Sequence, residues 1–142
     1  MLWTRLGARQ PGTPRKFAGA VLLAGLSFVL LALAAYLDSD GKVSPLWLVG
    51  TYVLLAVGEL MLAPVGLSAT TKLAPAAFSS QIMGLWFLAG AAGNGIGILV
   101  TQLYSDETEL AYFGVLGLCA IATAVLLYFA APRIRVLMQG VH

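Results

Sequence analysis

One carboxylate, Glu59, lies in the middle of a long apolar stretch of the sequence. Between residues 43 and 71 it is the only Asp, Glu, Lys or Arg, and it follows Pro45 by fourteen residues. If this stretch is a membrane helix with a rise of about 1.5 Å per residue, Glu59 lies near the bilayer centre. A charge there costs about 2.5 kcal/mol or more, and such residues usually face a bundle interior or a watery cavity. Glu59 is therefore predicted to mark a path or binding site for an ion or substrate.

A purely structural role for Glu59 is the alternative. The carboxylate would then pair with a neighbouring helix or stay protonated because it is buried. No Lys, Arg or His lies within any of the apolar stretches of this chain. A partner for Glu59 must therefore be a ligand, a proton or another polypeptide segment, which favours the functional interpretation.

The third apolar stretch carries an aromatic residue, Trp86, and a run of small residues. Its position alone leaves two interpretations of Trp86 open, a membrane-interface anchor or the wall of a cavity. Small residues allow close approach of helices in membranes, and Asn94 offers a hydrogen bond across a helix pair. A role in helix packing is accordingly predicted for Gly90, Gly93, Asn94 and Gly97.

The composition requires elements that cross a membrane. Sixty per cent of the residues are apolar and 10% are charged, against about 25% charged in soluble domains. No charged residue occurs in 17–37, 73–105 or 110–132. A bilayer core needs about 20 mostly apolar residues in a helix.

We therefore predict an all-α membrane protein with four transmembrane helices. Their expected ranges are 17–37, 45–67, 80–104 and 110–131. Pro64 is expected to kink the second helix near its end. The first apolar stretch is too long for the core of a signal peptide and lacks a small-residue cleavage site, so it is expected to remain as a span.

The basic residues predict the orientation in the membrane. With four spans, the segment 1–16, the linker around Lys72 and the tail 133–142 lie on one side and carry seven Lys or Arg. The other side carries one, Lys42. Because cytoplasmic loops are rich in Lys and Arg, both termini are expected in the cytoplasm, in a multi-pass protein of the cell membrane.

Several classes of function lack their usual signals. A net charge of +2, without a basic run flanked by aromatics, argues against nucleic acid. One carboxylate without a nucleophile, a metal-ligand cluster or a phosphate-binding loop argues against an enzyme and a bound metal or cofactor. The lone Cys119 has no second thiol for a disulfide within the chain.

The amino-acid sequence of the second and third spans is similar to that of a known family. The run GELMLAPVGLS at 58–68, TKLAP at 71–75 and MGLWFL at 83–88 resemble the proton-dependent oligopeptide transporter family of the major facilitator superfamily. RLGAR and PRKF in the first 17 residues also resemble the loop after that family's eighth helix. The resemblance covers nearly the whole chain and implies the carboxy-terminal portion of such a transporter, helices nine to twelve.

The resemblance implies a function and roles for three residues. The family couples proton flow to the uptake of di- and tripeptides, so the proton is the coupling ion. Glu59 matches the tenth-helix glutamate that faces the amino terminus of the peptide. Trp86 matches the eleventh-helix tryptophan that lines the peptide site. Ala63 stands where the family often has a serine, so a hydroxyl contact to the peptide is lost.

Other family motifs are absent from this chain. The first-helix glutamate and arginine motif and the fourth-helix lysine are missing, so the chain is expected to act with amino-terminal helices or a partner polypeptide. Two alternatives remain beside a peptide transporter. One is a small membrane subunit with a structural or regulatory role, and the other is a related facilitator with a different substrate.

Overall fold

The computed structural model describes residues 12–37 and 44–137. The predicted amino-terminal segment up to residue 11, the polar turn at 38–43 and the tail from 138 lie outside the described residues. The described part consists of four α-helices: α1 (Thr13–Leu37), α2 (Pro45–Leu73), α3 (Ser79–Thr101) and α4 (Glu109–Leu137). Short 3-10 turns precede α3 and α4. All four helices are long and apolar enough to span a membrane, which confirms the predicted fold class.

Three helices extend further than the apolar stretches that predicted them. The helix α2 continues to Leu73, where the predicted span ends at residue 67. Within this extension the hydroxyl groups of Thr70 and Thr71 donate to the carbonyls of Gly66 at 2.7 Å and Leu67 at 3.0 Å. Hydropathy marks the segment that lipid can hold, whereas a helix continues as long as its backbone groups are satisfied.

Proline residues do not end the helices. The predicted end of the fourth helix at residue 131, just before Pro132, is wrong, since α4 runs through this proline to Leu137. A proline removes one backbone hydrogen bond and crowds the turn before it, but it leaves the following residues free to stay helical. Pro64 likewise lies inside α2, which is helical on both sides of it. The kink expected at Pro64 stays a prediction.

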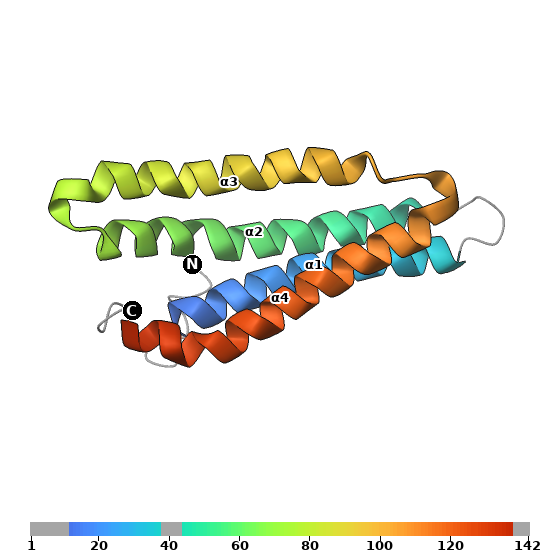
Figure 1. Ribbon diagram of the computed structural model, residues 1–142. Coiled ribbons are helices and arrows are strands. Elements are labelled where there is room, and N and C mark those ends of the chain that lie inside the picture. The colour runs from blue at the N-terminus through green and yellow to red at the C-terminus, as the bar shows by residue number, and fades with distance from the viewer. Residues whose placement is uncertain (1–11, 38–43, 138–142) are drawn as a thin grey trace.

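The helices form a row in the order α4, α1, α2, α3 (Figure 1). The helix α1 packs extensively on both α4 and α2, whereas α3 packs against α2 with far fewer contacts. Neighbours in the row run antiparallel, so the start of α1, the end of α4 and the turn between α2 and α3 lie at the same end of the bundle (Figure 1).

Small side chains fill the two interfaces of α1. Every buried residue in the part of the chain that the structure describes is Pro, Gly, Ala, Ser or Thr. On α1 these residues form two stripes with a spacing of seven, and α4 carries a third. The stripes are Ala18, Gly25 and Ala32; Ala20, Ser27 and Ala34; and Gly117, Ala124 and Ala131.

Two of these glycines bring α1 and α4 into backbone contact. A Cβ atom added to Gly117 would lie 3.2 Å from the carbonyl oxygen of Gly25 and 2.8 Å from Cγ2 of Val29. A Cβ atom added to Gly25 would lie 3.0 Å from the backbone nitrogen of Ile121. On the other side of α1, a Cβ atom on Gly58 would lie 3.1 Å from the carbonyl oxygen of Ala20. Small residues permit this approach, which supports helix association in lipid.

This packing predicts opposite effects for two substitutions on α4. Gly117→Ala should lower the free energy of unfolding by about 1–3 kcal/mol, because the added methyl group meets Val29 and the α1 backbone. Gly114→Ala is the matched control: its Cβ would meet nothing within 4 Å, so the better helix propensity of alanine should leave stability unchanged or raised. Thermal unfolding in detergent, followed by circular dichroism, measures both. Equal effects of the two substitutions would contradict the close contact.

Candidate functional site

The carboxylate of Glu59 is exposed at the midpoint of α2, fourteen residues from either end of the helix. Its chain neighbour Gly58 is buried against α1. One residue further along a helix the side chain points about 100° away, so Glu59 leaves the α1 interface. Among the described residues no ion pair reaches Glu59. The predicted intramembrane carboxylate is thus accessible and has no ion-pair partner among the described residues.

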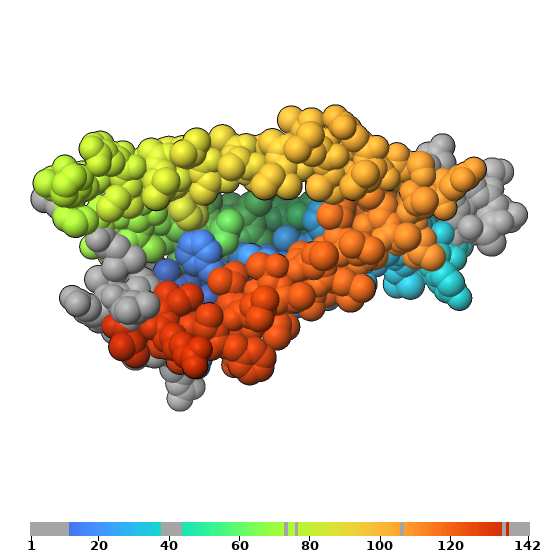
Figure 2. Space-filling view, in the orientation of Figure 1, coloured from blue at the N-terminus to red at the C-terminus, as the bar shows by residue number. Residues whose placement is uncertain are grey.

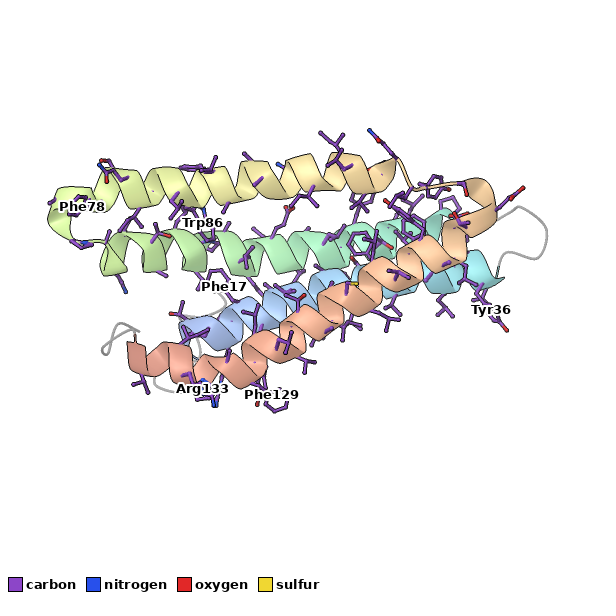
Figure 3. All side chains as sticks on the ribbon, viewed as in Figure 1. Phe17, Tyr36, Phe78, Trp86, Phe129 and Arg133 are labelled. Carbon is purple, nitrogen blue, oxygen red and sulfur yellow. The ribbon has the colours of Figure 1, made fainter. Side chains whose placement is uncertain are left out.

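Trp86 joins three helices. Its six-membered ring covers Gly66 of α2 so closely that a Cβ atom on Gly66 would overlap it. The same indole meets the ring of Phe17 on α1 edge to face, with 6.2 Å between ring centroids and 87° between planes. Figure 3 shows Trp86 projecting from α3 toward these two helices. Trp86 is half-buried, so it both anchors α3 and presents part of its surface.

The helical repeat places Glu59 on the same face of α2 as Gly66, because the two residues are seven apart. This is the face that Trp86 covers, about 10 Å further along the helix axis. Since α2 and α3 run antiparallel (Figure 1), the residue seven positions after Trp86, which is Gly93, stands at the level of Glu59. A small residue therefore lies across from the carboxylate.

The glycines of α3 border open space. A Cβ atom on Gly90, Gly93 or Gly97 would meet nothing within 4 Å, and Asn94 is exposed. The predicted role of these four residues in helix packing therefore finds no partner helix in the described ranges. Within these ranges, packing instead depends on Gly25, Gly58, Gly66 and Gly117, which sequence reasoning missed. The seven-residue repeat of small residues in the first and fourth spans was the signal that could have found Gly25 and Gly117.

A groove of about 680 Å³ lies beside Trp86. Phe17 and Val21 of α1 and Leu62 of α2 form part of its lining, together with Trp86, Gly90, Ala91 and Asn94 of α3. Figure 2 shows the hollow between α3 and α4, with α1 and α2 visible at its floor. The lining is apolar apart from the amide of Asn94 and the indole N–H of Trp86, so the groove suits an uncharged side chain.

Glu59 stands next to this groove rather than in its lining. Leu62, which does line it, lies three residues after Glu59 and hence on a neighbouring part of the same helix face. Ala63, one turn after Glu59, is exposed and offers no polar atom in its side chain. A carboxylate beside an apolar groove fits a ligand that carries a cationic group close to an apolar body.

Four antiparallel helices that can span a membrane, with an accessible carboxylate at the middle of one of them, are features of a membrane transporter. Comparison with known proteins identifies the transporter family. The model of the POT family matches residues 1–118, and the chain belongs to this family. It corresponds to the carboxy-terminal part of the family's proteins. This confirms the resemblance seen in the sequence.

Its relatives are transporters. The chain is 49% identical over 140 residues to the uncharacterized transporter YclF of Bacillus subtilis, covering 99% of this chain and 28% of that protein. It is 40% identical over 142 residues to a di-/tripeptide transporter of Lactococcus lactis subsp. lactis, covering 99% of this chain and 29% of the relative. The chain thus spans under a third of the length of these proteins.

Solved structures show the same fold. A crystal structure of the peptide transporter POT in complex with sulfate superposes with a TM-score of 0.91 at 50% identity, covering 98% of this chain and 28% of that one. A POT family transporter in complex with 5-aminolevulinic acid gives a TM-score of 0.88 at 36% identity, covering 94% and 28%. The four helices are therefore part of the helical transporter fold of the major facilitator superfamily.

The contact between Trp86 and Gly66 predicts a coupled pair of substitutions. Gly66→Ala should lower the free energy of unfolding by about 1–3 kcal/mol, because its methyl group occupies the space of the indole. In a Trp86→Phe background, where the side chain lacks the outer atoms of the indole, Gly66→Ala should lower the free energy of unfolding clearly less. Thermal unfolding followed by circular dichroism measures the cycle. Gly84→Ala, at an open position of α3, is the control. Strictly additive effects of Gly66→Ala and Trp86→Phe would contradict the contact between the indole and Gly66.

Proposed function

We propose that this chain forms part of the substrate cavity of a proton-coupled di- and tripeptide symporter, with Glu59 as the contact for the peptide's amino group. The observation that carries the proposal is a carboxylate exposed at the midpoint of a membrane-spanning helix, with no ion pair among the described residues. Relatives that are di-/tripeptide transporters support the substrate class. Transport, not catalysis, is the activity proposed.

The physical chemistry of the site fits an ammonium group. Two opposite unit charges 4 Å apart attract by roughly 4 kcal/mol at an effective dielectric constant of about 20, against about 1 kcal/mol in bulk water. A carboxylate in the middle of an apolar helix therefore binds a peptide's amino terminus more strongly than an exposed loop carboxylate does. The groove beside Trp86 offers the adjoining apolar surface for a peptide side chain.

The proton is the proposed coupling ion, and no other cofactor is proposed. Protonation of the Glu59 carboxylate removes the charge that attracts an ammonium group, so proton and peptide amino group compete for this side chain. Such competition links peptide release to protonation at the same residue.

Further helices complete the proposed cavity. The chain spans 28% of the length of YclF and 30% of that of a dipeptide and tripeptide permease A, and alternating access requires two repeats that move about a site near the bilayer midplane. The helix α3 has no buried residue within the described structure, so its apolar surface remains available to helices from the rest of such a transporter and to lipid. Amino-terminal helices or a partner polypeptide are the proposed partners.

Replacement of Glu59 tests the role of the carboxylate. In the transporter assembled from this chain and its partner helices, Glu59→Gln should weaken binding of a dipeptide with a free amino terminus by about 10- to 100-fold, the loss typical of a charged hydrogen bond. Isothermal titration calorimetry measures the affinity. Glu107→Gln removes the same charge from an exposed position in the turn before α4 and should leave binding unchanged.

Two outcomes of this experiment contradict the proposal. Unchanged affinity of the Glu59→Gln protein would show that the carboxylate does not contact the peptide. Lost assembly with the partner helices would assign Glu59 a structural role between polypeptides. An N-acetylated dipeptide provides a further control, because it lacks the ammonium group and should bind both proteins weakly.

The proposed orientation places both termini in the cytoplasm of a cell-membrane protein. Among the described side chains the bases Arg15, Lys16, Lys72 and Arg133 occur at the end of the bundle where α1 starts and α2 and α4 finish. The acidic Glu107 and Glu109 lie at the opposite end, around the start of α4. An excess of bases on the cytoplasmic side is the usual arrangement.

Cysteine labelling checks this orientation. In a Cys119→Ser background, a membrane-impermeant maleimide should label Ser105→Cys in intact cells, because Ser105 lies in the exposed turn at the acidic end. Ala77→Cys, exposed in the turn between α2 and α3, should react only after the cells are permeabilised. The reverse pattern would contradict a cytoplasmic location of the termini.

A further inference from the structure

A second groove lies between α1 and α4, on a different face of α1 from the groove beside Trp86. Its volume is about 440 Å³. The lining is apolar except at one end, where a guanidinium group and a phenol ring stand. It comprises Arg15, Ala18, Gly19, Leu22, Ala124, Val125, Tyr128 and Phe129. This groove has a charged mouth and an apolar body.

Aromatic contacts hold the charged mouth of this groove in place. The guanidinium carbon of Arg15 lies 5.8 Å from the centroid of the Tyr128 ring, a cation–π distance. Tyr128 in turn meets Phe129 edge to face, with 6.0 Å between ring centroids. Arg15 is exposed, and no ion pair neutralises it within the described chain. The guanidinium group of α1 is thus held against α4, and its positive charge is available to an anionic ligand.

A second guanidinium belongs to the same end of α4. Arg133 lies one turn after Phe129, is exposed, and has no ion pair among the residues that the structure describes. Figure 3 shows Arg133 and Phe129 on the side of α4 that faces away from α3. Residues four apart on a helix share a face, so Arg133 extends the positive charge at the mouth of the groove.

The exposure of the groove points to lipid as its surroundings. Its lining residues Leu22, Tyr128 and Phe129 are 39%, 54% and 72% exposed, and they belong to helices apolar enough to span a membrane. From Arg15 to Leu22 the groove follows α1 for about 10 Å. Its apolar length thus runs along the membrane-spanning part, and its charges stand where the headgroup region begins.

We propose that this groove binds an anionic phospholipid of the inner leaflet, with an acyl chain along the seam of α1 and α4 and the phosphate between Arg15 and Arg133. Charge complementarity selects this occupant, because a groove with a positive mouth and an apolar body matches a lipid with a negative headgroup and an apolar acyl chain. The described bases also gather at this end of the bundle, where the anionic leaflet attracts Lys and Arg by about 1 kcal/mol each. The site is separate from Glu59 and does not depend on peptide transport, but the choice of leaflet rests on the proposed orientation.

Lipid titration of the purified chain in neutral detergent tests this site. Native mass spectrometry compares binding of dioleoyl-phosphatidylglycerol with that of dioleoyl-phosphatidylcholine. Phosphatidylglycerol should bind about 10-fold more tightly, and Arg15→Gln or Arg133→Gln should each weaken it by about fivefold. Lys72→Gln is the matched control: it removes a base at the same end of the bundle but from α2, outside the groove lining, and should leave the affinity unchanged.

A variant of the apolar body completes the test. Val125→Trp fills the groove at a side chain that is 44% exposed, so it should weaken lipid binding without loss of helicity by circular dichroism. Glycerol 3-phosphate alone should not compete. Equal affinity for the two lipids, an equal loss in Lys72→Gln, or no loss in Val125→Trp would each overturn the proposal. Full competition by glycerol 3-phosphate would reassign the site to free phosphate esters.

Discussion

The two stripes of small residues on α1 are the constraint on which the rest of the described structure depends. Helices in lipid gain no hydrophobic energy by meeting each other, so their association relies on close packing. Gly25 of α1 allows close packing with α4, and Gly58 of α2 allows it on the other side of α1. A Cβ atom added to either glycine would lie about 3 Å from a backbone atom of the facing helix. Because both sides of α1 are occupied in this way, α1 must lie inside the row, with α4 and α2 on either side.

The attachment of α3 follows a different principle. Its large side chain Trp86 is seated over Gly66 of α2 and against Phe17 of α1. Trp86 covers this face of α2 at the level of Gly66, whereas at the level of Glu59 the same face is exposed. Glycine thus serves two opposite purposes in this chain: on α1 and α2 it admits a neighbour, whereas on α3, as at Gly93, it leaves space empty.

The number and type of the elements followed from the sequence because hydropathy and charge are local properties. The sequence also singled out Glu59, since a carboxylate at the centre of an apolar helix needs water, a ligand or a partner. Helix ends were less predictable: α4 passes through Pro132 because the effect of a proline is confined to one turn. A spacing of seven, as between Ala18 and Gly25, marks a packing face but does not say which helix meets it, so the partners of the packing glycines could not be predicted.

The separation of charges supports the proposed role of Glu59 as a binding group. All bases among the described side chains stand at one end of the bundle, whereas Glu59 lies at the midpoint of α2. If α3 carried an arginine such as Arg15 beside Gly93, its guanidinium group would pair with the carboxylate of Glu59. This pair would compensate the cost of placing a carboxylate at the centre of an apolar helix. In the described helices that compensation is missing, so the free energy that a paired charge would recover remains available to a cation that enters from outside.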